Sequence, residues 1–196
     1  MDVLELEKEK KSLTRLNLLQ YNPIKIDLFE EDYSLDSLIS NDNFEKLCKK
    51  YKESFGYSKL KTFSFSKEGF LGLFLELKGK IAVSLGECEA LIQGAKLYES
   101  LGFDIVWLGL NKDGKVNLYQ LENQNIDFLF LSSYVMDTFV KTPLEEVKKI
   151  SSFKIISNGT AQISSFSDAI YFDNYKLTGY NLSGVLLFEK EDFFEL

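Results

Sequence analysis

The sequence contains no histidine and a single arginine, Arg15. Without histidine, imidazole acid–base catalysis, Ser-His triads and histidine metal ligands are all excluded. Enzymes that act on amino acids commonly hold the substrate carboxylate with a bidentate guanidinium fork, and lysine does not reproduce that geometry. Prolines are also scarce, with only Pro23 and Pro143 in the chain. The lack of histidine and the single arginine thus argue against enzyme classes that depend on imidazole catalysis or on a guanidinium fork.

Cysteine and long apolar runs are equally scarce. Cys48 and Cys88 lie far apart and form no CxxC motif, which predicts two reduced, mostly buried thiols rather than a disulfide or a metal site. No apolar run reaches the length of a membrane span, and the N-terminus lacks a hydrophobic signal-peptide core. We therefore expect a cytoplasmic protein with no membrane partner. The net charge of −7 argues against nucleic acid as a partner.

The 196 residues, 45% of them hydrophobic, suit one α/β domain with a full core. We expect an N-terminal helical and irregular segment over residues 1–58 and the α/β domain over residues 59–196. Apolar strand patterns alternate with helical patterns, which predicts a three-layer sandwich around a mostly parallel sheet of about seven strands. The expected strands are 61–65, 80–85, 103–110, 127–131, 154–157, 169–172 and 184–188. The expected helices are 41–55, 70–77, 88–101 and 143–150, with a further short helix starting in 116–123.

The last two expected strands are joined by a short segment that contains Lys176. This connection is too short for a crossover helix, so the two strands should be antiparallel, or one of them lies at an edge. A lysine at a strand end of an α/β sheet sits where such sheets place ligand chemistry. When desolvated, it can form a Schiff base with an aldehyde cofactor. The alternative is an ordinary solvated loop lysine.

The stretch AIYFDNYKLTGYNLSGVLLFEK, residues 169–190, resembles the lysine segment of the class V aminotransferases and cysteine desulfurases. These fold-type I enzymes use pyridoxal phosphate, and their pattern is roughly SGHK-x-x-G-P-K-G-x-G. Gly179 and Gly184 fall at two of the family's glycines. The order KIAVS, GAKLYESLGF, DGKV, DFLFLSS and TPLEEV is similar to the same family's large domain, so the resemblance covers residues 60–190. It implies pyridoxal phosphate on Lys176 and a homodimer.

The resemblance also assigns the other cofactor-binding residues. The family's phosphate loop, close to SGGTEA, falls at residues 66–69, where Ser66 and backbone N–H groups near Gly69 would hold the phosphate. An ordinary tight turn is the favoured interpretation here, because Glu68 brings a like charge to a phosphate. Asp137 or Asn158 would meet the cofactor ring. The family's ring-stacking histidine and its following Asn-Asn-Glu would fall near Ser133, Val135, Met136 and Asp137. The aspartate that pairs with the ring nitrogen in the family would fall at Asn158 or Gly159, and the family's glutamine is kept as Gln162.

These replacements predict a degenerate site. We expect residues 1–196 to lack the family's C-terminal small domain, which holds its substrate arginine and desulfurase cysteine. A separate partner protein could supply that domain. One interpretation is a minimal pyridoxal-phosphate transferase or lyase with Lys176 as the catalytic lysine. The second is a non-catalytic relative that acts as a partner-binding or structural subunit. A third, an unrelated doubly wound binding domain, requires the order of motifs to be a coincidence.

Overall fold

The computed structural model describes residues 42–122, 124–150, 153–160, 162–173 and 183–189. Lys176, Gly179 and the N-terminal 41 residues lie outside these ranges. No helix within them is long and apolar enough to cross a bilayer.

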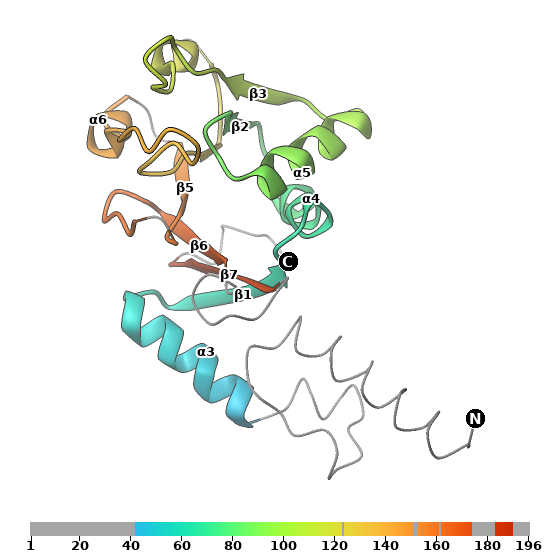
Figure 1. The fold of residues 1–196 in the computed structure, drawn as a ribbon. Helices are drawn as coiled ribbons and strands as arrows, with labels where there is room; N and C mark the ends of the chain where they lie inside the picture. The colour runs from blue at the N-terminus through green and yellow to red at the C-terminus, as the bar shows by residue number, and fades with distance from the viewer. Residues whose placement is uncertain (1–41, 123, 151–152, 161, 174–182, 190–196) are drawn as a thin grey trace, which may run out of the picture.

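Seven strands form one sheet in the order β1–β7–β6–β5–β4–β2–β3 (Figure 1). The strands are β1 (Lys59–Ser64), β2 (Ile81–Ser84), β3 (Ile105–Leu108), β4 (Phe128–Phe130), β5 (Lys154–Asn158), β6 (Ala169–Asp173) and β7 (Ser183–Phe188). All pairings are parallel except those of β7, which runs antiparallel to both β6 and β1. The predicted seven-stranded, mostly parallel sheet is therefore confirmed, and so is the antiparallel pairing of the last two strands.

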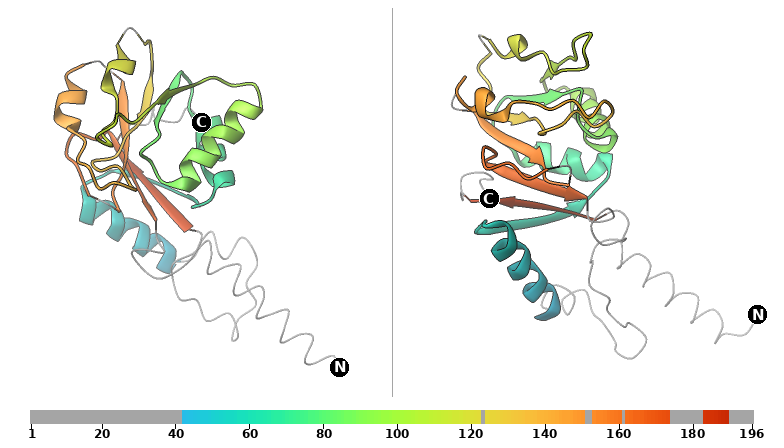
Figure 2. Two further views of the ribbon diagram at one scale, coloured as in Figure 1. Left: turned by 45° about the horizontal axis from the view of Figure 1, so that its top comes forward. Right: turned by 60° about the vertical axis from the view of Figure 1, so that its left-hand side comes forward.

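Helices cover both faces of this sheet, as Figure 2 shows. The helices are α3 (Asp42–Phe55), α4 (Lys67–Glu76), α5 (Glu89–Ser100) and α6 (Leu144–Lys148), with a 3-10 helix, η1 (Leu118–Leu121). α5 ends before Gly102, whose φ of +93° gives the glycine stop that the sequence indicates. The helix expected around residue 118 is a single 3-10 turn, and β3 is shorter than expected.

Side chains of each strand alternate between two apolar layers because successive residues of a strand point to opposite faces. On β6, Tyr171 packs among residues of α4 and α5, whereas Phe172 faces the other side. There Phe172 contacts Phe55 of α3, with ring centroids 4.6 Å apart. α3 thus packs on the sheet although it precedes the domain boundary predicted at residue 58, and that boundary stays a prediction.

The segment Ser66–Gly69 is not the tight turn that the sequence favours. Its last three residues form the first turn of α4, and Ser66 is the N-cap, with its Oγ accepting the Gly69 N–H at 3.3 Å. The helix begins three residues earlier than expected because Ser66 caps it and Gly69 has no side chain. A Cβ on Gly69 would lie 1.7 Å from the carbonyl oxygen of Ser64. Gly69 therefore lets α4 start directly against the end of β1.

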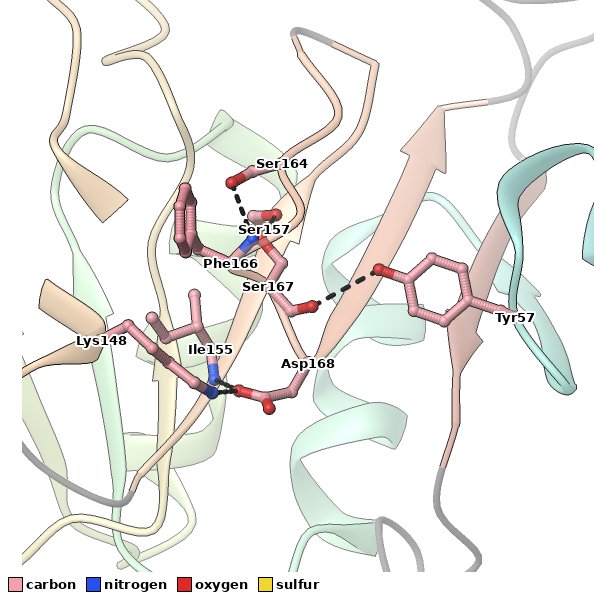
Figure 3. A network of polar contacts seen from close by, with 8 residues as sticks. All are labelled: Tyr57, Lys148, Ile155, Ser157, Ser164, Phe166, Ser167 and Asp168. Carbon is pink, nitrogen blue, oxygen red and sulfur yellow. Dashed lines mark hydrogen bonds and ion pairs between the residues drawn. The ribbon is translucent and has the colours of Figure 1, made fainter. Parts of the chain in front are cut away.

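The connection from β5 to β6 is held by the polar network of Figure 3. The Asp168 carboxylate accepts the backbone N–H of Ile155 at 2.8 Å and forms an ion pair with Lys148 of α6. Next to it, the hydroxyls of Ser157 and Ser167 lie 2.5 Å apart. This network fixes where β6 begins relative to β5, and thereby the register of Tyr171.

We expect Asp168→Ala to lower the free energy of unfolding by about 2 kcal/mol. The substitution removes the acceptor of a part-buried backbone N–H and leaves Lys148 without its ion-pair partner. Urea unfolding followed by circular dichroism measures the change. Glu145→Ala is the matched control, because its pair with Lys149 is exposed and should contribute less than about 0.5 kcal/mol. Equal losses in the two variants would contradict the role assigned to Asp168.

Candidate functional site

A pocket of about 710 Å³ lies at the carboxyl ends of the parallel strands. Three segments line it: the start of α5 with the residues before it, the connection from β4 to α6, and the end of β5. The lining residues are Glu87, Cys88, Glu89, Ile92, Tyr134, Met136, Asp137, Phe139, Asn158 and Thr160. We call this the carboxyl-edge pocket. In open α/β sheets this is the edge at which ligands bind.

Two loops are fastened together to form the pocket wall. The backbone N–H of Met136 donates to the carbonyl of Gly86 at 2.8 Å. Gly86 permits this approach, because a Cβ there would lie 3.0 Å from a methyl carbon of Val135. Phe139 on the same loop is 79% exposed and has a φ of +55°, which is rarely adopted by a bulky residue. The loop thus presents an aromatic side chain at the rim of the pocket.

A buried carboxyl group forms the base of the pocket. Glu87 is only 4% exposed, and its Oε2 accepts hydrogen bonds of 2.7 Å from both the Tyr171 phenol and the Ser132 hydroxyl. The Ser132 Oγ in turn accepts the backbone N–H of Asn158 at 2.9 Å. Cys88 adjoins the same network, with its Sγ 3.8 Å from the Tyr171 oxygen. The network thus ties the ends of β4 and β5 and the middle of β6 to the start of α5.

Burial governs the acidities of this network. It raises the pKa of the Glu87 carboxyl, although the hydrogen bonds from Tyr171 and Ser132 act in the opposite direction. Burial also raises the pKa of the Tyr171 phenol well above its usual value, and the neighbouring Cys88 and Glu87 add to this shift. Tyr171 therefore stays protonated and acts as a hydrogen-bond donor. Glu87 holds a proton more tightly than an exposed glutamate does.

Asn158 ends β5 with its side chain toward the pocket. Its Oδ1 accepts the backbone N–H of Thr160 at 2.9 Å, and its Nδ2 lies 3.8 Å from the sulfur of Met136. Asn158 is 2% exposed, and its amide side chain carries no charge. An amide at this position can form a hydrogen bond with a ring nitrogen but cannot stabilise a pyridinium cation as a carboxylate does.

The structure brings together only some of the residues that the sequence assigns to the cofactor. Asp137 and Asn158 line the carboxyl-edge pocket, as does Met136. Gln162 lines a separate hollow of about 360 Å³ beside α6, together with Ser133. Ser66 and Gly69 line neither. No observation tests the roles of these residues, which stay predictions.

The N-terminus of α4 is occupied by the protein's own polar groups. Ser66 accepts the Gly69 N–H and receives a hydrogen bond from Ser64 Oγ at 3.1 Å. Hydrogen bonds from its own backbone N–H and from Ser66 lower the pKa of the exposed Glu68 carboxyl, which is therefore an anion at neutral pH. A phosphate would meet a carboxylate at this helix terminus. The described residues at the terminus of α4 thus do not fit the phosphate of pyridoxal phosphate.

Sequence reasoning missed the residues at the base of the pocket. Glu87 follows the buried strand β2 and precedes α5. Its position at the carboxyl end of a parallel strand could therefore have indicated a site residue. Tyr171 gave no such signal, because a tyrosine within an alternating strand is indistinguishable from an ordinary core aromatic. Their pairing joins residues 84 positions apart and depends on the three-dimensional fold.

No protein-family model matches the chain, and no curated protein matches it in sequence. Solved structures do match. A NifS-like protein aligns over 95% of this chain and 56% of its own, with a TM-score of 0.65 and 15% identity. A cysteine desulfurase from Thermococcus onnurineus NA1 aligns over 93% and 52%, with a TM-score of 0.57 and 15% identity. A serine palmitoyltransferase from S. paucimobilis, with a bound PLP–myriocin aldimine, aligns over 92% and 50%, with a TM-score of 0.59 and 9% identity.

These similarities establish the fold. The chain has the fold of the fold-type I pyridoxal-phosphate enzymes, and it spans about half the length of the solved structures that it matches. At identities of 9–15% they carry no activity over to this chain.

Proposed function

We propose that this chain is an aminotransferase- or cysteine-desulfurase-like protein of the PLP-dependent transferase fold, with degenerate catalytic groups and with Lys176 at the Schiff-base position. The observation that carries the proposal is the carboxyl-edge pocket, which has the volume for a pyridoxal ring and is lined by Asn158 and Asp137. When bound, pyridoxal phosphate supplies a reactive aldehyde and an electron-withdrawing ring. The homodimer implied by the resemblance is part of this proposal.

The described residues would act on the ring in distinct ways. Asn158 would hydrogen-bond the ring nitrogen, and the Phe139 side chain at the rim would shield the ring from water. An uncharged amide leaves the ring a weaker electron sink than a carboxylate would, so we expect slow chemistry at most. The phosphate would add little affinity, because Glu68 stands at the terminus of α4 where an anion would be attracted.

Absorbance spectroscopy tests this proposal. Titration of the parent protein with pyridoxal and with pyridoxal phosphate should produce a visible band with either compound, and Lys176→Ala should abolish it. Because the phosphate contributes little, the two dissociation constants should agree within about fivefold. Glu68→Gln should tighten the binding of pyridoxal phosphate alone, by about two- to fivefold, because it removes a charge of the same sign as the phosphate.

The matched control is Lys112→Ala, which removes an exposed loop lysine elsewhere in the chain and should leave the band intact. A band that survives Lys176→Ala would show reaction at other lysines and refute the assigned position. No band with either compound would favour the second candidate function.

That second candidate is a non-catalytic relative that serves as a partner-binding or structural subunit. Two observations favour it specifically: the terminus of α4 is filled by the protein's own groups, and Asn158 already uses its Oδ1 on Thr160. Under this alternative the fold is kept for its surfaces, and a separate polypeptide is the natural partner. Affinity capture with the intact chain becomes informative once the spectra show no band.

A further inference from the structure

Cys88 places a thiol in the carboxyl-edge pocket, and it adjoins the buried Glu87 in the sequence. It is half-buried and lines the pocket, and it is the N-cap residue of α5, a helix of 12 residues. Its side chain makes no capping hydrogen bond to the helix. The Sγ is instead directed to the Tyr171 oxygen, 3.8 Å away, and that phenol lies 2.7 Å from Glu87. A thiol, a phenol and a carboxyl group therefore form one continuous chain.

The hydrogens in this chain have one consistent arrangement. Tyr171 has a single hydroxyl hydrogen and donates it to the Glu87 Oε2. The Cys88 thiol must then be the donor of the contact between its sulfur and the phenol oxygen. A proton can pass from Cys88 to Tyr171 while the Tyr171 proton passes to Glu87. This shift moves negative charge from a fully buried carboxylate to a thiolate at a helix N-terminus, where the helix dipole stabilises an anion.

We propose that Cys88 is a nucleophilic thiol of the carboxyl-edge pocket, that Tyr171 and Glu87 accept its proton in relay, and that it captures a small uncharged carbonyl compound. The inference does not rest on the proposed function, because it needs neither Lys176 nor pyridoxal phosphate. Tyr171 and Glu87 are positioning and proton-transfer residues in this scheme.

The proposed step is an addition that needs no further reactant. The sulfur–carbon bond forms as the π pair of the carbonyl moves to its oxygen. The thiol proton passes through Tyr171 to Glu87, and the oxygen takes up a proton from water, so that the product is a hemithioacetal. Return of the Glu87 proton to solvent restores the carboxylate.

The charges of the pocket select the ligand class. The carboxylates of Glu89 and Asp137 line it beside Glu87, whereas Ile92 and Phe139 supply apolar surface. An anionic electrophile would be repelled by these carboxylates, and an uncharged one would not. The pocket volume of about 710 Å³ leaves room for a small organic molecule.

Alkylation kinetics test the proposal, and the chain provides its own control. Cys48 on α3 is also half-buried, and burial raises the pKa of its thiol. The intact protein is treated with iodoacetamide or iodoacetate, and both cysteine peptides are followed by mass spectrometry. At pH 6.5 we expect Cys88 to react with iodoacetamide at least about tenfold faster than Cys48. The ratio of the iodoacetamide rate to the iodoacetate rate should also be at least about threefold larger at Cys88 than at Cys48.

Two variants distinguish a relay from simple electrostatics. Glu87→Gln removes the proton acceptor, so the Cys88 rate at pH 6.5 should fall by about tenfold and then rise about tenfold per pH unit, as for an ordinary thiol. Simple electrostatics predicts the opposite, because loss of a nearby negative charge favours the thiolate. Tyr171→Phe should give the same loss by breaking the chain of hydrogen bonds.

A rate at Cys88 that does not exceed that of Cys48, or an increase in Glu87→Gln, would overturn the proposal. If Tyr171→Phe fails to fold, the comparison of Cys88 with Cys48 in the parent protein still decides it. Equal preference for the two reagents at both cysteines would overturn the assigned ligand class.

Discussion

Gly69→Ala should lower the free energy of unfolding by about 4 kcal/mol, one of the largest losses available to a single methyl group in this chain. The added Cβ would lie 1.7 Å from the carbonyl oxygen and 2.7 Å from the carbonyl carbon of Ser64. Both atoms belong to the backbone, so no rotamer change can relieve the contact. Either α4 must move away from β1 or the end of the strand must shift, and both options disturb the packing of Phe70.

The same helix contains the matched control. Gly72 lies one turn further along α4, and a Cβ there would meet nothing within 4 Å. Gly72→Ala should therefore raise the free energy of unfolding by about 0.5–1 kcal/mol, because alanine loses less conformational entropy in a helix. Urea unfolding of both variants measures the contrast. Losses of similar size at Gly69 and Gly72 would show that helix geometry, rather than the contact with Ser64, decides the outcome.

This contrast also bears on the role of Gly69. The sequence assigns it to cofactor phosphate binding through its backbone N–H, but that N–H already donates to Ser66. The close approach to Ser64 is a sufficient physical reason for glycine at this position. A variant that folds poorly would thus report packing and carry no information on phosphate binding.

The sheet could be predicted from the sequence because its signals are local. The run Ile81–Ser84 is fully buried and mostly apolar, and it is followed by a helical pattern of the length that a crossover needs. The antiparallel pairing of β6 with β7 followed from the length of their connection alone. The return of β7 to pair with β1 joins distant parts of the chain, and no local pattern indicates it.

The pocket was predicted less well than the sheet. Asn158 and Asp137 were placed at the ring by the resemblance to the family's site positions, and both line the carboxyl-edge pocket. Gln162 was placed with them by motif spacing, yet it lies beside α6, because the connection from β5 to β6 leaves the pocket after Thr160. Glu87 was missed because a single glutamate in a loop is normally solvated. Its burial depends on two hydroxyl donors from distant strands.

Glu87→Ala should lower the free energy of unfolding by about 3 kcal/mol at neutral pH. It leaves the buried hydroxyls of Tyr171 and Ser132 without their shared acceptor and opens a space at the base of the pocket. The control is Glu89→Ala, two residues away and exposed, which should change stability by less than about 0.5 kcal/mol. Comparable losses in the two variants would contradict a structural role for the buried network.

Glu87→Gln should behave differently, with an effect that depends on pH. Because burial raises the pKa of Glu87 in the folded protein, the folded state binds more protons than the unfolded chain between the two pKa values. The stability of the parent therefore falls as pH rises above the ordinary carboxyl range of about 4.5 and through the folded pKa. Glutamine does not titrate and still offers an oxygen acceptor to Tyr171.

Urea unfolding of the parent and of Glu87→Gln at pH 4 and pH 8 separates the effect of the carboxyl's titration from that of its hydrogen bonds. At pH 4 the parent and Glu87→Gln should be about equally stable, since the parent carboxyl is mostly protonated in both states. At pH 8 the variant should be the more stable by about 1–2 kcal/mol, because the folded parent must either bury a charge or hold a proton that the unfolded chain releases. A variant that is less stable than the parent at pH 8 would mean that the hydrogen bonds of the carboxylate outweigh its desolvation.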